Sequence, residues 1–238
     1  MPKHTQKRQT TLGRAPYVRP ARPKGFTPVP RTNRSLTQHP TFCHNEELYK
    51  ALAQLLPDPE HQKRKYVGMP PRRRFMGNPV PRKELLVHWK GGCTYKFGGK
   101  RHASVPLSDL PPAVRVYLRA MFQRAAELLG HRVDVVLINF YKDGKDSVSD
   151  HSDNDDNMDP DSKVLSVSVG ATRDFKIIPN AIPAGKKRKQ SFKIPLVGGS
   201  ALIMFPRFQT EFLHGIPKIT KRVIGSRFNL TFRKLVNV

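Results

Sequence analysis

The pattern of apolar and polar residues predicts one long helix near the middle of the chain. Between Pro112 and Gly130, apolar residues recur at helical spacing, at Val114, Leu118, Met121, Ala125 and Leu128. Ser108 and Asp109 are predicted to supply the N-cap, Pro111 and Pro112 stand at the helix start, and Gly130 follows the helix end. We interpret this segment as a packing helix.

After Gly130 the period of the pattern changes to two, which is typical of strands. In VDVVLINFY (133–141), one face is predicted to carry Val133, Val135, Leu137, Asn139 and Tyr141. Further strands are predicted at residues 166–171, 190–196, 200–205 and 226–233, separated by Gly, Pro and Asn. Several short strands after one helix favour a mostly β protein with helical cover (α+β), built as a β-sandwich or double-sheet barrel.

The last predicted strand has two chemically different faces. Alternation places Phe228, Leu230 and Phe232 on an apolar face that must be buried. The opposite face carries Arg227, Asn229, Thr231 and Arg233. This polar face either meets solvent, as an exposed basic edge strand, or lines a cavity. Two arginines and a hydroxyl in a cavity would form a socket for a small dianion, because guanidinium groups bind carboxylates in a bidentate manner.

Charge changes the picture of the surface. The chain of 238 residues has 43 Lys or Arg against 18 Asp or Glu, a net charge of +25. A polyanion such as nucleic acid is therefore the expected partner, and a merely solvated basic surface is the alternative. Two cysteines do not indicate a disulfide framework. No apolar run approaches the roughly 20 residues of a membrane span, so no membrane association is expected.

Composition also divides the chain into two parts. Residues 1–45 contain no acid, nine Lys or Arg and seven Pro. We predict that they form a disordered basic arm, which contacts nucleic acid, directs nuclear import or only improves solubility. The folded domain is predicted to comprise residues 46–238.

One short motif suggests a metal site. In His151-Ser-Asp153, an imidazole and a carboxylate project from the same face of an extended chain, and His214 follows a later strand. Two His and one carboxylate form a facial triad that suits Fe(II) and leaves coordination positions open. Six acids lie between Asp150 and Asp161. A calcium loop is excluded there because the required glycine and glutamate are missing, and Asp156, Asp159 and Asp161 are expected to be largely a solvated loop.

Several motifs, taken in order, resemble the AlkB family of nucleic-acid dealkylases, and most closely its eukaryotic homologue that repairs duplex DNA. They are VPRK (80–83), TYKF (94–97), Asn139-x-Tyr141-x-x-Gly144, His151-x-Asp153, SVSVGATRDF (166–175), GGSALIM (198–204), His214 and RFNLTFR (227–233). The resemblance covers roughly residues 72–236. It implies a double-stranded β-helix (jelly-roll) core and an Fe(II)/2-oxoglutarate-dependent dioxygenase that oxidises the N-alkyl groups of bases.

The resemblance also implies roles for individual residues. His151, Asp153 and His214 would ligate iron. Arg227 and Arg233 would hold the two carboxylates of 2-oxoglutarate, and the co-substrate pocket would be completed by Asn139, Tyr141, Asn229 and Thr231. Dioxygen would be the second co-substrate.

Substrate contacts are implied more loosely. Tyr95 and Phe97 would belong to the pocket for the damaged base, and His151 would stack on it. Contacts to the substrate are also assigned to Arg74, Phe75, Met76, Arg82, Asn154 and Asp155. Phe75 or Met76 would fill the gap left by an extruded base. The negative field of the acid cluster would favour a cationic methylated base. Contacts to the nucleic-acid backbone are assigned to Lys187, Arg188, Lys218, Lys221 and Arg222, each of which could equally be solvated.

DNA is the expected substrate, with RNA as the alternative, and a non-catalytic nucleic-acid-binding module is a third possibility that the complete triad argues against. The bases at issue are of the 1-methyladenine and 3-methylcytosine type, and the products would be formaldehyde and succinate. We expect a monomer, located in the nucleus if the protein is eukaryotic.

Overall fold

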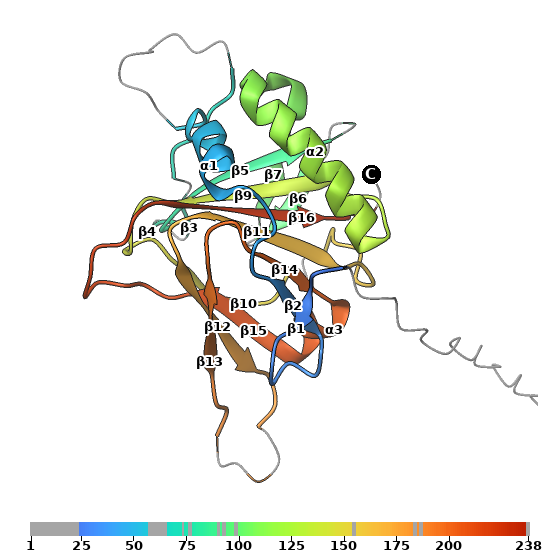
Figure 1. Cartoon of the computed structure of the whole chain (residues 1–238), viewed down its shortest axis with the longest axis vertical. Coiled ribbons are helices and arrows are strands. Elements are labelled where there is room, and N and C mark those ends of the chain that lie inside the picture. Colours follow the sequence, from blue (N-terminus) through green and yellow to red (C-terminus); the bar gives the residue numbers. More distant parts are fainter. Residues whose placement is uncertain are drawn as a thin grey trace, which may run out of the picture.

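The computed structural model describes residues 24–56, 66–72, 74–75, 78–89, 91, 94–97, 100–153, 156–182, 185 and 188–236, with only the backbone at 74–75, 78–79, 96–97 and 100. Its core consists of two antiparallel-rich sheets that face each other, with helices on the outer face of the larger one (Figure 1). This arrangement confirms the mostly β fold with helical cover and is consistent with a jelly-roll core. No helix in the described part of the chain is both long and apolar enough to cross a membrane.

The larger sheet has eight strands in the order β1-β2-β14-β11-β16-β9-β5-β8. Their bounds are β1 (Thr27–Pro28), β2 (Leu36–His39), β14 (Ala201–Met204), β11 (Val164–Gly170), β16 (Arg227–Arg233), β9 (Val135–Tyr141), β5 (Lys83–His88) and β8 (Val105–Pro106). The four-stranded sheet has the order β10-β15-β12-β13, with β10 (Val148–His151), β15 (Phe212–Ile216), β12 (Arg173–Pro179) and β13 (Phe192–Leu196). Two separate hairpins are β3 (Arg74–Phe75) with β4 (Asn78–Pro79), and β6 (Thr94–Phe97) with β7 (Lys100–Ala103).

Two helices, α1 (Asn45–Ala53) and α2 (Pro112–Leu129), cover the outer face of the large sheet (Figure 1). A third, α3 (Pro206–Glu211), leads directly into β15. The alternation predicted for 227–233 is confirmed, because Phe228, Leu230 and Phe232 lie in the cluster under the helices. The opposite face of β16 is therefore turned toward the smaller sheet.

The predicted start of α2 at Pro111 and Pro112 and its predicted end are confirmed, whereas the predicted N-cap at Ser108 and Asp109 is wrong. Gly130 is the C-cap, and its φ of +72° lies in the left-handed region that glycine adopts without strain. Pro111 is the N-cap and makes no side-chain cap hydrogen bond. Ser108 and Asp109 instead lie in a short 3₁₀ helix, η1 (Leu107–Asp109).

The strand predicted at residues 133–141 begins two residues later than predicted. β9 starts at Val135, and Val133 packs in the cluster under the helices, whereas Val135, Leu137 and Tyr141 pack between the sheets. The face assigned to Val133 was wrong because the two-residue alternation holds only within the strand.

The predicted boundary between a disordered arm and a domain starting at residue 46 is also wrong for residues 24–45. β2 pairs with β14 in the large sheet, and Leu36 on β2 is fully buried. Phe26, Val29 and Phe42 are buried as well. A few widely spaced apolar residues suffice here because β14 supplies a preformed edge. Residues 1–23 lie outside the described part of the chain.

Candidate metal centre

A small cavity of about 60 Å³ lies between the two sheets, and we call it the metal cavity. Most of its polar lining comes from strands that face each other. Arg82 precedes β5; β9 contributes Asn139 and Tyr141, β10 His151, β15 His214, and β16 Arg227, Asn229, Thr231 and Arg233; Asp153 follows β10. The structure thus brings together, in one cavity, all the residues predicted for iron and for 2-oxoglutarate.

The two predicted histidine ligands are direct neighbours across β10 and β15. His151 pairs with His214 in the register of these strands, and their ring centroids are 4.5 Å apart. His151 Nε2 lies 3.5 Å from Asp153 Oδ1, and His214 Nε2 lies 3.8 Å from Asp153 Oδ2. One ligand atom from each of the three residues lies within 4.8 Å of the other two, and no further such group occurs among the described residues. This donor set fits Fe(II).

Each ligand is oriented by a contact on its other side. The His151 ring has Nδ1 2.9 Å from the carbonyl oxygen of Ser149, so a proton at Nδ1 leaves Nε2 for a metal. The His214 ring packs against both Phe175 and Phe208, at centroid distances of 5.2 and 5.6 Å. The backbone N–H of Asp153 donates to Oε1 of a different residue, Gln209 on α3, across 2.8 Å.

The ionisation of the three ligands is strongly perturbed. Burial lowers the pKa of His214 to about 3, so this imidazole is neutral and able to ligate. Burial also works against ionisation of Asp153, but Arg233 and the two histidines outweigh it and hold the pKa of Asp153 below its usual range. The pKa of His151 is raised, because the hydrogen bond and charge of Asp153 outweigh the effect of burial. His151 is 39% exposed, the only ligand open to solvent.

The predicted dianion socket is present beside the ligands. Arg227 is buried, and burial lowers its pKa to about 10. Its Nη2 donates to Ser168 Oγ across 3.0 Å, but Nε and Nη1 have no hydrogen-bond partner. Buried donors without a partner are costly unless a ligand arrives. A carboxylate of 2-oxoglutarate fits this requirement, and the opposite end of the same strand carries Arg233.

The remaining socket residues form a hydrogen-bonded chain. Thr231 Oγ1 donates to Asn229 Oδ1 across 3.2 Å, and Asn229 Nδ2 donates to Ser166 Oγ across 2.8 Å. Arg82 Nε donates to Asn139 Oδ1 across 2.8 Å and its Nη2 pairs with Glu84 at 2.6 Å. Arg82, predicted to touch substrate, is therefore also a support for the co-substrate pocket.

Tyr95 is the one described side chain of the predicted base pocket. It is fully buried on β6, and the guanidinium carbon of Arg233 lies 5.3 Å from its ring centroid. The side chains of Arg74, Phe75 and Phe97 lie outside the described part of the structure. Met76, Asn154, Asp155 and Lys187 also lie outside it, so their predicted roles stay predictions.

Four of the residues predicted to contact the nucleic-acid backbone lie in the described part of the chain, and all four are on the surface. Arg188, Lys218, Lys221 and Arg222 are exposed and do not line the metal cavity. Their exposure is compatible with phosphate binding and equally with solvation.

The acid cluster predicted to surround the metal site is dispersed. Asp150 pairs with Lys176 at 2.7 Å, and Asp159 pairs with Lys234 at 2.5 Å. Asp156 and Asp161 are exposed. Of the described members, only Asp153 lines the metal cavity, because alternate residues of β10 point to opposite sides of the sheet. The predicted negative field is therefore weakened, because lysines pair with Asp150 and Asp159 and Arg233 pairs with Asp153.

Sequence reasoning missed Gln209 and Arg173, which hold the site from outside. Arg173 is 1% exposed and donates to the carbonyl oxygens of Asp143, Asp146 and Pro217, at 2.7 to 3.1 Å. These bonds tie the turn after β9 to the loop after β15. Its presence in SVSVGATRDF was the available signal. Gln209 gave none, because its partner Asp153 is 56 residues away in sequence.

Comparisons with known proteins all indicate a 2-oxoglutarate-dependent oxygenase. The sequence profile of the 2OG-Fe(II) oxygenase superfamily matches residues 35–233. The DNA oxidative demethylase ALKBH2 of Mus musculus is 36% identical over 160 residues, which are 66% of this chain and 63% of that protein. The alpha-ketoglutarate-dependent dioxygenase alkB homolog 3 of Mus musculus is 31% identical over 198 residues, 82% of this chain and 64% of that protein. The chain thus spans slightly less than two thirds of the length of these relatives.

A solved structure supports the same fold. The structure of OsALKBH1 has a TM-score of 0.52 to this chain at 18% identity, and the match covers 84% of this chain and 98% of that one. At this identity the similarity concerns the fold alone.

Proposed function

The chain belongs to the 2OG-Fe(II) oxygenase superfamily, and we propose that it is a dioxygenase that removes alkyl groups from DNA bases by oxidation. The resemblance to the AlkB family is confirmed by the relatives described above. One observation carries the proposal: a 2-His-1-carboxylate group and two buried arginines share one cavity of about 60 Å³. The Nε and Nη1 donors of Arg227 are buried in this cavity without a hydrogen-bond partner, and a bound carboxylate would supply one.

The residues present fit the implied groups. His151, Asp153 and His214 would hold Fe(II), and Arg227 and Arg233 would hold the two carboxylate ends of 2-oxoglutarate. When bound, iron with 2-oxoglutarate and dioxygen supplies oxidising power: one oxygen atom enters the N-methyl group and the other enters succinate, with release of carbon dioxide. The hydroxymethyl product then loses formaldehyde and a proton, which restores the unsubstituted ring nitrogen of the base.

The protein's own residues position the reactants. Arg233 keeps Asp153 ionised, and Gln209 fixes the backbone of the same ligand. His151 is the ligand that faces outward, so a base brought to the site meets this ring first. The small size of the metal cavity excludes bulk water from the co-substrate pocket.

DNA is favoured as substrate because the relative ALKBH2 is named a DNA oxidative demethylase and because the net charge of +25 suits a polyanion. A base methylated at a ring nitrogen is a cation. Asp153 is the only acid among the described residues that line the metal cavity, and Arg233 offsets its charge, so these residues supply no net negative field that would select the cation.

The test is mass spectrometry of oligonucleotides that carry 1-methyladenine or 3-methylcytosine, after incubation with protein, Fe(II), ascorbate and 2-oxoglutarate. Replacement of one methyl group by hydrogen, together with equimolar succinate, is the predicted outcome on DNA. His151→Ala is the matched control, because His151 is the most exposed ligand and its loss should spare the fold. A methylated RNA of the same sequence tests the alternative substrate. No methyl loss on any strand, while iron still binds, would refute the proposal.

A further inference from the structure

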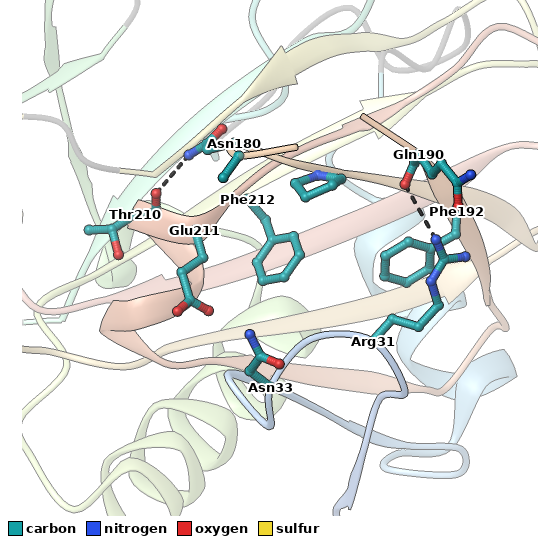
Figure 2. Close-up of a pocket in the computed structure, with 10 residues that line it drawn as sticks. Arg31, Asn33, Asn180, Gln190, Phe192, Thr210, Glu211 and Phe212 are labelled. Carbon is teal, nitrogen blue, oxygen red and sulfur yellow. Dashed lines mark hydrogen bonds between the residues drawn. The ribbon is translucent and has the colours of Figure 1, made fainter. Parts of the chain in front are cut away.

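A second cavity, of about 650 Å³, shares no lining residue with the metal cavity; we call it the lateral cavity (Figure 2). It is bounded by the loop of residues 29–35, by the facing ends of β12 and β13, and by the junction of α3 with β15. Its volume is sufficient for a small molecule or a single nucleotide. The activity proposed above makes no use of it.

The lining combines three kinds of chemistry. Phe192 and Phe212 supply aromatic walls, and Figure 2 shows their two rings on the same side of Arg31, one on each side of an open space. Asn33, Asn180 and Gln190 supply carboxamides. Asn180 Nδ2 donates to the carbonyl oxygen of Thr210 at 2.7 Å, which leaves its side-chain oxygen as an acceptor. Aromatic faces with carboxamides are the groups that bind unpaired bases, by stacking and by hydrogen bonds to base edges.

Arg31 provides the anion-binding element. Its guanidinium carbon lies 4.5 Å from the Phe192 ring centroid, and Nη2 reaches the Gln190 carbonyl oxygen at 3.5 Å, a long contact. No carboxylate in the described part of the chain pairs with Arg31. The one acid in the lining, Glu211, already pairs with Arg207. The planar guanidinium is therefore available to a phosphate at the mouth of the cavity.

The loop that carries Arg31 is held in a strained shape. Arg31, Asn33 and Arg34 have φ values of +66°, +47° and +62°, and no other described residue except glycine has a positive φ. Side chains inside the loop maintain this shape: Thr32 Oγ1 donates to the Val29 carbonyl oxygen at 2.8 Å. Strain of this kind is found where a loop must present side chains in a fixed direction.

The geometry points to a nucleotide-binding subsite. We propose that the lateral cavity accepts one unpaired, unmodified nucleotide, with its base between Phe192 and Phe212 and its phosphate on Arg31. The exposed Lys189, next to Gln190, adds charge of the required sign. A peptide is disfavoured because three carboxamides and a free guanidinium match a base and a phosphate better than an apolar side chain.

This subsite deepens the proposed function, on which it rests, by assigning a second point of contact to the same strand. β15 carries Phe212 of the lateral cavity and His214 of the metal centre two residues apart, and the Phe208 ring contacts both, at 5.3 and 5.6 Å. The lateral cavity and the metal centre are therefore neighbours within the fold. The subsite would hold a flanking nucleotide of an unpaired strand.

The chain offers a matched pair of variants. Arg31 and Arg34 are both exposed, lie three residues apart and have backbones in the left-handed region, but only Arg31 lines the lateral cavity. Arg31→Gly and Arg34→Gly each remove one charge and relieve one strained residue. Binding of a fluorescent, unmodified oligothymidylate is measured by anisotropy for both. Arg31→Gly should weaken binding about tenfold, as for loss of a charge-assisted hydrogen bond, whereas Arg34→Gly should weaken it by less than about twofold, the effect of one distant charge.

A second measurement locates the base. Photocrosslinking of an oligothymidylate that contains 5-iodo-2′-deoxyuridine, followed by mass spectrometry, should place the crosslink on Phe192 or Phe212, and Phe192→Leu should reduce it severalfold. Equal losses for the two arginine variants, or crosslinks only elsewhere, would overturn the subsite. Displacement of the oligonucleotide by an acidic peptide but not by thymidine monophosphate would assign the cavity to a peptide instead. Neither measurement uses a methylated base or requires turnover, so both can be interpreted even if the proposed demethylase activity is absent.

Discussion

Arg233 donates a hydrogen bond from Nη2 to Oδ1 of Asp153 across 2.7 Å, and both side chains are 5% exposed. One arginine thus neutralises a metal ligand while forming one end of the predicted dianion socket. Removing one partner of a buried ion pair leaves an uncompensated charge and costs about 3–5 kcal/mol. We predict that Arg233→Met lowers the free energy of unfolding of the metal-free protein by about that amount.

Metal should reverse this loss, since a bound divalent ion supplies the positive charge that Asp153 then lacks. Urea unfolding with and without Mn(II), which does not support turnover, measures the effect. Arg227→Met is the control, because Arg227 is equally buried but pairs with no carboxylate in the metal cavity. Equal rescue of both variants by Mn(II) would contradict the assignment.

Arg227 should affect the co-substrate more than the metal. Its unpartnered Nε and Nη1 form a fork that a lysine cannot reproduce. We predict that Arg227→Lys raises the KM for 2-oxoglutarate about tenfold or more, as expected for removal of a bidentate interaction worth roughly 1.5–3 kcal/mol. Succinate formation at varied 2-oxoglutarate measures KM, and iron titration should show little change. An unaltered KM would mean that Arg227 only supports Ser168 and the sheet.

Gln209 should act through Asp153 without touching iron. Its Oε1 is the acceptor for the Asp153 N–H at 2.8 Å, and its own side chain is buried. Outer contacts of this kind typically change metal affinity by about 10- to 100-fold. We predict such a loss for Gln209→Met, which keeps the volume but removes the acceptor, and recovery of most of the affinity in Gln209→Glu. A loss in both variants that follows their stability would show a merely structural role.

The face of each strand could be read from sequence where the strand is long and its two sides differ chemically. β16 shows this: the alternation of arginines with phenylalanines correctly placed Arg227 and Arg233 on the face opposite the apolar cluster, and that face lines the metal cavity. Residues whose meaning depends on distant partners could not be read. The role of Gln209 depends on Asp153, and that of β2 depends on the edge of β14. Arg31 and Asn33, which line the lateral cavity, fell in a segment whose composition resembled a disordered arm.

The corrected boundary leads to a prediction about truncation. Residues 1–23 contain six Lys or Arg and no acid. Deleting them should leave the unfolding transition nearly unchanged and weaken binding to all oligonucleotides alike. Each phosphate that the truncated protein no longer neutralises flattens the dependence of log affinity on log salt by about 0.7–0.9. With six cationic side chains removed, the slope should therefore fall by at most about four to five. Fluorescence anisotropy over a range of salt concentrations measures it.

Deleting residues 1–39 should have a different effect, because it removes β1 and β2 with the buried Phe26, Val29 and Leu36. Burial of each such side chain contributes about 1.5–3 kcal/mol, so the loss should exceed about 4 kcal/mol and leave the β14 edge open to aggregation. Thermal unfolding of the two truncations side by side separates the effects. If both truncated proteins were as stable as the full chain, β2 would not contribute to the stability of the fold. If both were unstable, residues 1–23 would also contribute to it.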